Sequence, residues 1–450
     1  MDFSRLKHIY FLGIGGIGMS ALARYFKAMG IAVSGYDKTE TALTQTLENE
    51  GINVHFSDLG PAVLNVLDKD QSLVVYTPAI PNGFGELEAL QNAGFIIYKR
   101  AQVLGFITEN SFGIGVAGTH GKTTTSTMLA HVLHQTIGCN AFLGGISANY
   151  NSNLILNSDS NISVLEADEF DRSFLQLKPK AGVLTSIDAD HLDIYGDSNQ
   201  IEQGFQAFVH LIDPDGYILM HHSIPLSANC EVIRYGLDAR SGIIGKNPRM
   251  SNSYFVLDVK IEGKEWCEVK LGVPGLHNAE NALAVIGVCV KLGLNEAQIR
   301  HGLESFKGVK RRFEYIVRRD DFVYIDDYAH HPSEIHALVN SVRLMYPNWK
   351  ITGIFQPHLF SRTRDFLDGF AQELSRLDEL ILMPIYPARE LPIEGVDAQA
   401  IAAKIHGIDV KILNHTQTLT YMETQKPQLL ITIGAGDIDL LVNPLKEWFA

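Results

Sequence analysis

Short runs of consecutive apolar residues alternate along this chain with longer segments in which apolar residues recur every three or four positions. Residues 8–12 form one apolar run, residues 19–29 follow a helical period, and residues 31–37 form a second apolar run. Continuous apolar runs of this length are typical of strands buried on both faces, as in parallel sheets. Because such strands alternate with helices, the pattern predicts an α/β fold.

The alternation divides the chain into three units, and we predict one domain for each. Residues 1–107 are expected to form a Rossmann-like parallel sheet, residues 108–313 a central P-loop-type α/β domain, and residues 314–450 a C-terminal Rossmann-like α/β domain. The predicted strands are residues 8–12, 31–37, 53–56, 72–76 and 95–98, then 112–116, 162–166, 182–187, 216–221, 254–261 and 266–271, and finally 322–327, 351–355, 379–383 and 429–433.

A glycine-rich segment, A-G-T-H-G-K-T-T-T at residues 117–125, joins a predicted strand to a predicted helix. This arrangement binds nucleotide phosphates, because backbone N–H groups and the helix N-terminus face the anion. Val116 stands where the standard P-loop has its first glycine, so the segment is a shortened variant of that loop. The alternative interpretation is a glycine-rich turn whose lysine is solvated. We expect Lys122 to reach the outer phosphates of a nucleotide and Thr123 to hold Mg²⁺. The predicted phosphate-binding residues are Gly118, Thr119, His120, Gly121, Lys122, Thr123 and Thr124.

Two acidic clusters follow predicted strands of the central unit. Glu166 ends one strand and begins the run E-A-D-E-F-D, and His191 lies in D-A-D-H-L-D after the next strand. In open α/β sheets, ligands lie beyond the carboxyl ends of the strands, so both clusters should meet at the phosphates. Carboxylate oxygens suit Mg²⁺. We therefore predict metal contact for Glu166 and metal or phosphate contact for His191, although either residue could instead be structural.

A second glycine loop follows the first predicted strand. Gly13, Gly15 and Gly18 match the dinucleotide fingerprint G-x-G-x-x-G, and Asp37 lies about twenty residues further on, where a ribose ligand is expected. Taken alone, this loop indicates only a nucleotide diphosphate. An NAD-dependent dehydrogenase would use the same fingerprint, but that function leaves the loop at residues 117–125 and the acidic clusters unexplained.

Further polar residues are candidates for the nucleoside and for a carboxylate substrate. Asn278 and Asn281 begin a predicted helix next to His277, where they could cap the helix or contact adenine or ribose. The basic triplet at residues 310–312 could be a solvated hinge or a phosphate clamp. The candidate ligands for a carboxylate are His330, His331, Arg362 and Arg364.

Composition limits the partners that we expect. The net charge of -14 argues against a general nucleic-acid or membrane-surface binder. The four cysteines show no C-x-x-C pair, which suits reduced thiols rather than disulfides or a zinc site. No apolar run approaches the roughly 18 residues of a membrane span, and residues 1–7 lack a signal peptide's apolar stretch. We therefore expect a cytoplasmic protein with no nucleic-acid and no membrane partner.

The motifs together resemble those of one family, the Mur ligases, over essentially the whole chain. The resemblance implies that the first domain binds a UDP-sugar rather than NAD, that the central domain binds ATP, and that the third domain closes over both while it positions an amino acid. The motifs that carry it are, in chain order, G-I-G-G-I-G-M-S-A-L-A, A-G-T-H-G-K-T-T-T, E-A-D-E-F-D, S-I-D-A-D-H-L-D-I-Y-G, G-L-H-N-A-E-N-A-L-A, R-R-F-E, D-D-Y-A-H-H-P-S-E and Q-P-H-L-F-S-R-T-R-D.

The resemblance also implies roles for individual residues. Lys122 would hold the β- and γ-phosphates, with Thr123 and Glu166 on one Mg²⁺ and His191 on a second. Leu359 departs from the family, in which arginine is frequent at this position, so Arg362 and Arg364 are left to supply positive charge. The implied residues are Lys122, His191, His330 and Arg362 for catalysis; Asn278, Asn281, Arg312 and Asp326 for the adenosine and phosphates; and Gly13, Gly15, Gly16, Ile17, Gly18, Asp37, Thr77, Ala79 and Arg100 for the UDP-sugar.

The implied reaction joins L-alanine to the lactoyl carboxylate of UDP-N-acetylmuramate through an acyl phosphate, with ATP and Mg²⁺, in peptidoglycan precursor synthesis. Other branches of the family carry a carbamylated lysine beside the metals, whereas no lysine occurs here between Lys180 and Lys246, which fits the alanine-adding branch. The competing interpretations are the recycling ligase that attaches a ready-made tripeptide to the same UDP-sugar, and a non-catalytic nucleotide-binding regulator. We expect a monomer or a weak homodimer.

Overall fold

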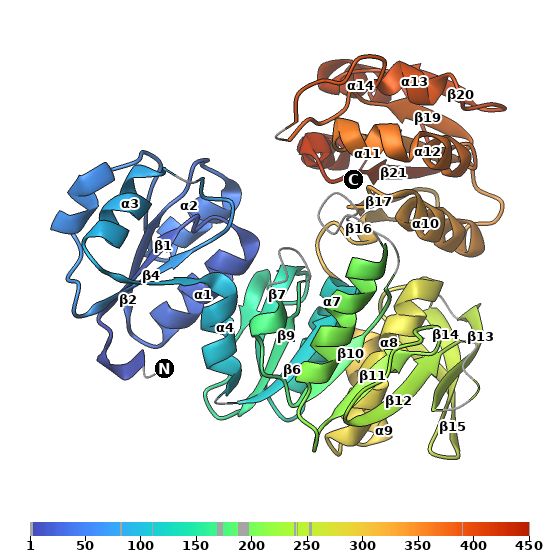
Figure 1. Ribbon diagram of the computed structural model, residues 1–450. Coiled ribbons are helices and arrows are strands. Elements are labelled where there is room, and N and C mark those ends of the chain that lie inside the picture. The colour runs from blue at the N-terminus through green and yellow to red at the C-terminus, as the bar shows by residue number, and fades with distance from the viewer. Residues whose placement is uncertain are drawn as a thin grey trace. The chain divides into compact units, whose positions relative to one another are not determined.

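The protein forms two compact units in a computed structural model that describes residues 3–81, 83–109, 111–168, 174–187, 198–237, 240, 242–251, 254–388 and 390–449. The first unit comprises residues 1–248, 256–271 and 279–307, and the second comprises residues 249–255, 272–278 and 308–450. Each unit is described by itself below. The predicted α/β class is confirmed, with three sheets that follow one another along the chain (Figure 1).

The N-terminal sheet, blue in Figure 1, has five strands in the order β3-β2-β1-β4-β5, and every adjacent pair is parallel. The Rossmann-like prediction is therefore confirmed. The apolar residues in the middle of β1 and β4 are fully buried, as is typical of strands at the centre of a parallel sheet. The elements are β1 (His8–Leu12), α1 (Ile17–Ala28), β2 (Ala32–Tyr36), α2 (Ala42–Asn49), β3 (Asn53–His55), β4 (Ser72–Tyr76), α3 (Gly85–Asn92) and β5 (Ile96–Lys99), with short 3₁₀ helices at Phe3–Arg5 and Gly60–Asn65.

The central sheet has ten strands in the order β15-β14-β13-β12-β11-β10-β6-β9-β7-β8. The pairs from β12 across to β7 are parallel, and β8 pairs with β7 in the antiparallel direction. The strands are β6 (Phe112–Ala117), β7 (Asn140–Ser147), β8 (Ser152–Ile155), β9 (Ile162–Glu166), β10 (Ala181–Leu184), β11 (Tyr217–His221), β12 (Glu231–Gly236), β13 (Ile243–Ser251), β14 (Tyr254–Ile261) and β15 (Lys264–Leu271). The helices are α4 (Arg100–Glu109), α5 (Lys122–His134), α7 (Ser198–Leu211), α8 (Leu276–Lys291) and α9 (Glu296–Ser305).

The C-terminal sheet has six strands in the order β16-β17-β21-β18-β19-β20, in which only the pair β16–β17 is antiparallel. Its strands are β16 (Glu314–Arg318), β17 (Val323–Asp327), β18 (Ile351–Phe355), β19 (Glu379–Leu382), β20 (Asp409–Ile412) and β21 (Leu429–Ile433). Its helices are α10 (Pro332–Met345), α11 (Phe360–Asp365), α12 (Leu367–Leu374), α13 (Ala398–Ala402), α14 (His415–Met422) and α15 (Val442–Phe449), with a 3₁₀ helix at Asp437–Leu441.

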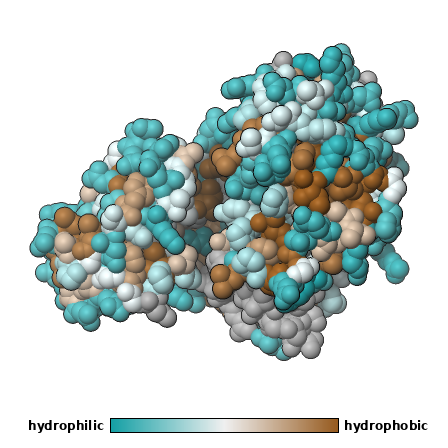
Figure 2. All heavy atoms as spheres, turned by 90° about the horizontal axis from the view of Figure 1, so that it is seen from above, coloured by the Kyte–Doolittle hydropathy of each residue, from teal (hydrophilic) through white to brown (hydrophobic). Residues whose placement is uncertain are grey.

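The molecular surface carries mainly hydrophilic side chains on the face seen in Figure 2, and hydrophobic side chains gather there in smaller patches. Among the described helices, none has the length and apolar character needed to cross a membrane.

Candidate functional site

The phosphate-binding loop predicted from the sequence lies at the carboxyl end of β6 and leads into α5. Gly121 caps the helix with a φ of 79°, and Gly118 has a φ of 137°, so both lie in the region of backbone conformation that favours glycine. Space is also limited at these positions, because a Cβ at Gly118 would lie 2.1 Å from Thr185 Oγ1. The two glycines thus allow the backbone to turn sharply in front of the α5 N-terminus.

Two residues that follow β10 hold the loop from the other side. Thr185 Oγ1 donates to the carbonyl of Ala117 at 3.2 Å, and its backbone N–H donates to the same oxygen at 3.0 Å. Ser186 Oγ accepts from the backbone N–H of His120 at 2.9 Å and lies 2.8 Å from Thr119 Oγ1. The predicted strand at residues 182–187 ends earlier, at Leu184, because these residues leave the sheet to bind the loop.

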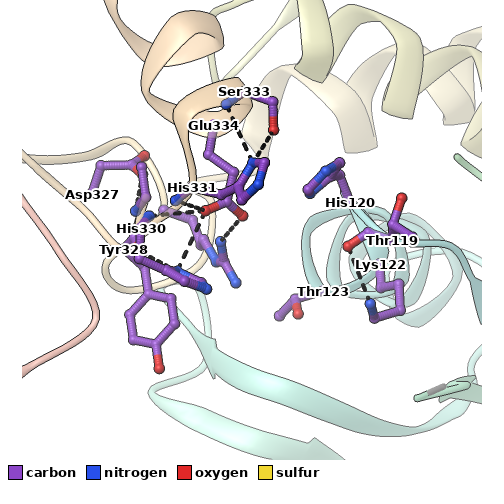
Figure 3. Close-up of polar contacts among 12 residues, drawn as sticks. Thr119, His120, Lys122, Thr123, Asp327, Tyr328, His330, His331, Ser333 and Glu334 are labelled. Carbon is purple, nitrogen blue, oxygen red and sulfur yellow. Dashed lines mark hydrogen bonds and ion pairs between the residues drawn. The ribbon is translucent and has the colours of Figure 1, made fainter. Parts of the chain in front are cut away.

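The ammonium group of Lys122 lies against the loop that precedes it. Its Nζ donates to the carbonyl oxygens of Gly118 at 2.6 Å and Thr119 at 3.4 Å (Figure 3). A fixed positive charge therefore lies where the N-terminal end of α5 already favours an anion.

Glu166 ends β9 directly beside the loop, because β9 pairs with β6 and places Glu166 opposite Val116. Thr123 Oγ1 donates to Glu166 Oε1 at 2.9 Å, and the backbone N–H of Gly144 donates to Oε2 at 3.0 Å. A carboxylate and a hydroxyl in contact form a set of oxygen donors that suits a hard divalent cation. His191 and its acidic neighbours Asp188, Asp190 and Asp193 lie outside the described residues.

The glycine loop of the N-terminal sheet is held by Asp37. The backbone N–H of Gly15 donates to Asp37 Oδ2 at 2.7 Å, and the N–H of Thr39 donates to Oδ1 at 3.2 Å. Gly13 has a φ of 87°, and a Cβ there would lie 2.4 Å from Thr77 Cγ2. The carboxylate expected to bind ribose thus holds the loop in its turn, and Thr77 packs against the loop's first glycine.

Arg100 lies against the first turn of α1, where Ile17 and Gly18 begin the helix. A Cβ at Gly18 would lie 2.3 Å from Arg100 Nη1, and Arg100 Nη2 is 4.0 Å from Asp168 Oδ2. A guanidinium at a helix N-terminus strengthens the local preference for a diphosphate. Gly16 precedes this helix as its cap, and Ala79 lies in the turn that Thr77 begins, with its N–H 3.5 Å from Thr77 Oγ1.

In the second unit, Asp326 is buried near the carboxyl end of β17, and only 1% of its side chain is exposed. Thr432 Oγ1 donates to Asp326 Oδ1 at 2.5 Å, and Arg311 Nε lies 3.4 Å from Oδ2. Burial raises the pKa of Asp326 to about 6, although the Thr432 hydrogen bond and the Arg311 charge oppose the shift. The guanidiniums of Arg311 and Arg312 lie over the Tyr328 ring, at 5.1 and 4.9 Å from its centre.

His330 and Arg362 belong to one electrostatic environment in the second unit. His330 Nδ1 lies 2.9 Å from the carbonyl of Tyr328 and 3.4 Å from Glu334 Oε2. Burial lowers the pKa of His330, and the positive charge of Arg362 lowers it further, whereas Glu334 opposes the shift. The lowered pKa favours the neutral form of the ring.

His331 has a different position from His330, because it is the cap of α10. Its Nδ1 accepts from the backbone N–H of Ser333 at 3.4 Å, and Glu334 Oε2 accepts from the N–H of His331 at 3.2 Å (Figure 3). Arg364 is exposed and donates to its neighbour Asp365 at 2.7 Å. Arg362 thus contributes to the electrostatic environment of His330, whereas Arg364 pairs with Asp365.

The two asparagines at the start of α8 are both buried. Asn278 Nδ2 donates to the carbonyl of Pro274 at 2.7 Å. Asn281 lies in the first unit beside the phosphate loop, since a Cβ at Gly121 would be 2.7 Å from Asn281 Oδ1. A buried amide beside a phosphate loop, as at Asn281, is well suited to select a nucleoside.

Reasoning from the sequence missed three residues that support these sites. Thr185 and Ser186 hold the phosphate loop, and Glu334 accepts N–H groups from both His330 and His331. The signal for Glu334 was present, because H-P-S-E places an acid three residues after a capping position with proline between them. No comparable local signal existed for Thr185 and Ser186, whose partners lie more than sixty residues away.

Known proteins resemble this chain over nearly its whole length. Three family models match consecutive parts of the chain: Mur ligase family, catalytic domain (residues 8–111), Mur ligase middle domain (116–289) and Mur ligase, glutamate ligase domain (311–437). A UDP-N-acetylmuramate--L-alanine ligase from Flavobacterium psychrophilum is 44% identical over 449 residues, which cover 99% of each chain. The chain belongs to the Mur ligase family. A UDP-N-acetylmuramate--L-alanine ligase from Porphyromonas gingivalis is 45% identical over 461 residues, covering 98% of this chain and 99% of that Mur ligase.

Solved structures of Mur ligases share the fold over almost the whole chain. The UDP-N-acetylmuramate-alanine ligase from Thermotoga maritima superposes with a TM-score of 0.82 at 29% identity, covering 98% of this chain and 99% of that one. A murein peptide ligase from Psychrobacter arcticus gives a TM-score of 0.68 at 24% identity, with the same coverage.

Proposed function

We propose that this Mur ligase joins L-alanine to UDP-N-acetylmuramate at the expense of ATP. The observation that carries the proposal is the identity of 44% over 99% of the chain with a relative of that name. The site supports it independently, because an anion-binding loop, a fixed ammonium and a strand-end carboxylate lie together in the first unit. These groups are the ones that phosphoryl transfer requires.

The reaction proceeds in two balanced steps. A carboxylate oxygen of the muramyl lactoyl group attacks the γ-phosphorus of ATP, so that an acyl phosphate forms and ADP leaves. The amine of alanine then attacks the acyl carbon, and phosphate leaves as the amide forms and the amine loses a proton. The first step brings two anions together, and Lys122 with the backbone N–H groups of the loop offsets that repulsion.

Mg²⁺ fits the residues present, because Glu166 and Thr123 offer oxygen donors in mutual contact beside the loop. When bound, the ion would neutralise phosphate charge during transfer. Glu166→Gln keeps the shape of the side chain and removes its charge, so we expect this variant to need several-fold more Mg²⁺ for half-maximal activity. A Mg²⁺ titration of ligation checks this, and an unchanged titration curve would assign Glu166 to loop support alone.

The remaining groups have proposed roles within their own units. The glycine loop at residues 13–18, which Asp37 holds in its turn, binds the UDP-sugar together with the Thr77 turn and Arg100, and Asn281 contacts the nucleoside of ATP. In the second unit, Arg312 and Asp326 bind the nucleotide, while neutral His330 and cationic Arg362 orient alanine or accept its proton.

The test is a comparison of acceptors. Purified protein, ATP, Mg²⁺ and UDP-N-acetylmuramate are mixed with L-alanine, glycine, L-serine or the tripeptide, and phosphate release and amide product are measured. We expect product with L-alanine and none with the tripeptide. Product with the tripeptide alone would support the recycling ligase, whose fold this chain also shares, and no phosphate release with any acceptor would overturn a ligase function.

We further propose that the protein is a monomer or a weak homodimer. One chain contains all the residues proposed to bind the substrates. The reaction therefore does not require a second copy of the protein. Sedimentation velocity across a range of concentrations measures this directly, and a concentration-independent oligomer would contradict it.

A further inference from the structure

A cavity of about 430 Å³ lies in the first unit between the strands β12 to β14 and the C-terminal part of α8. Its floor is apolar and includes Ile243 and Ile261, which are buried, together with Ile233 and Val290. Ligand cavities typically measure roughly 300 to 1,000 Å³, so this one has room for a small organic molecule.

The cavity is separate from the nucleotide loop. Glu231 begins β12 and Lys291 ends α8, and both line the cavity. The phosphate loop instead follows the carboxyl end of β6, and β6, β10, β11 and β12 run parallel to one another. The cavity therefore lies at the amino edge of these strands, at the opposite end of α8 from Asn281.

Among the described residues that line the cavity, positive charges outnumber negative charges by one. Lys291 Nζ pairs with Glu231 Oε2 at 2.7 Å, so these two charges offset each other. Arg240 and Lys260 also line the cavity, and Glu262 is the other carboxylate among its described lining residues. Within the part of the chain that the structure describes, neither of these two cations forms a hydrogen bond or an ion pair.

We propose that this cavity is a second binding site, for a small organic monoanion with an apolar body. The anionic group contacts Arg240 and Lys260, and the apolar body lies on the isoleucine floor. Each contact replaces water at a cation with a charge-assisted hydrogen bond, while the floor contributes through burial of apolar surface.

The probe is 8-anilinonaphthalene-1-sulfonate, which carries one sulfonate on an aromatic body and fluoresces more strongly when bound. Its uncharged counterpart without the sulfonate is N-phenyl-1-naphthylamine. We expect the full-length protein to bind one sulfonate probe per chain, with saturating ADP and Mg²⁺ failing to displace it. The uncharged counterpart should bind more weakly.

Two variants and one control locate the site. The double variant Arg240→Glu/Lys260→Glu should raise the Kd of the sulfonate probe at least about tenfold. The same variant should leave the Kd of the uncharged probe unchanged. Val290→Trp fills the cavity and should weaken both probes. Lys246→Glu reverses an exposed charge on β13 outside the cavity and should change neither. Ligation activity of each variant confirms that it is folded.

Three results would overturn the proposal. Displacement of the sulfonate probe by ADP would place it in the nucleotide site. An equal Kd in the double variant and in Lys246→Glu would show that the two cations do not bind it. Failure of the folded protein to bind the probe at all would remove the site.

Discussion

Single side chains set the charge of the proposed phosphate site, and Lys122 is the clearest case. It is held by two loop carbonyls at 2.6 and 3.4 Å, so its charge is in place before substrates bind. We expect Lys122→Ala to reduce ligation by roughly 10²- to 10³-fold, because a preorganised charge that stabilises the transition state is lost. Phosphate-release kinetics measure this loss, with Lys246→Ala as a surface control.

The same variant should retain its affinity for UDP-N-acetylmuramate, because the glycine loop proposed to bind the UDP-sugar precedes α1, whereas Lys122 begins α5. Calorimetry with the UDP-sugar tests this division of labour. A parallel loss of UDP-sugar affinity in Lys122→Ala would contradict it.

A buried histidine at the far end of α5 makes stability depend on pH. His131 Nδ1 lies 2.8 Å from the Tyr150 hydroxyl, and Nε2 lies 3.0 Å from Ser305 Oγ. Burial, together with the charges of His134, His301 and Lys307, lowers the pKa of His131 from 6.5 to about 4. The neutral ring therefore contributes stability that is complete above pH 6.5 and is lost as the pH falls toward 4.

This shift corresponds to about 3 kcal/mol of unfolding free energy between pH 6.5 and pH 4. His131→Asn does not titrate in that range, so the stability advantage of the unaltered protein over this variant should shrink by about that amount. Urea denaturation at several pH values measures it, and His406→Asn at an exposed position controls for the substitution itself. A constant difference between the unaltered protein and His131→Asn would show that His131 is not the titrating group.

At the scale of elements, the α10 cap explains why one of two adjacent histidines is structural. His331 accepts from Ser333 N–H, and Glu334 accepts in return from His331 N–H. We expect His331→Ala to lower the unfolding free energy of the second unit by about 1 kcal/mol, and His331→Ser to restore most of it. Chemical denaturation followed by the fluorescence of Trp349 and Trp448, which lie in this unit, measures both. Equal stability of the three proteins would mean that the cap contributes nothing.

The elements that could be predicted from the sequence are those whose signal is local. The run at residues 8–12 followed by G-I-G-G-I-G, and the loop at residues 117–125, each contain strand, turn and helix within a few residues. Strands β7, β8, β12, β13, β16 and β20 were not predicted. In β13, for example, charged and polar residues such as Lys246 and Asn247 interrupt the strand, so its apolar pattern is weak and sheet pairing determines it.

In the candidate site, too, only residues with a local sequence signal could be predicted. Glu166 was predicted because a strand end is where an open α/β sheet presents its ligands, and the structure places it beside Thr123. Thr185 and Ser186 were missed, because a hydroxyl after a strand gains its role only from the loop that folding brings to it.

For the whole molecule, the identity of the first domain's ligand decides between a ligase and a dehydrogenase. The glycine loop cannot distinguish the diphosphate of NAD from that of a UDP-sugar, because both would meet the same backbone N–H groups. Asp37, the residue that would select the NAD ribose, already accepts from Gly15 and Thr39 at 2.7 and 3.2 Å. Arg100 beside Gly18 instead adds positive charge at the diphosphate end.

We therefore predict that UDP-N-acetylmuramate raises the melting temperature of the protein, whereas NAD and NADP at the same concentration do not. A ligand present at about a hundred times its Kd adds about 2.7 kcal/mol to the free energy of unfolding, which a thermal melt resolves. UDP alone should give a smaller shift, since it lacks the sugar and lactoyl contacts. A shift with NAD as large as that with UDP-N-acetylmuramate would mean that Asp37 can leave the loop to bind ribose, and the ligase would lose its proposed acceptor site.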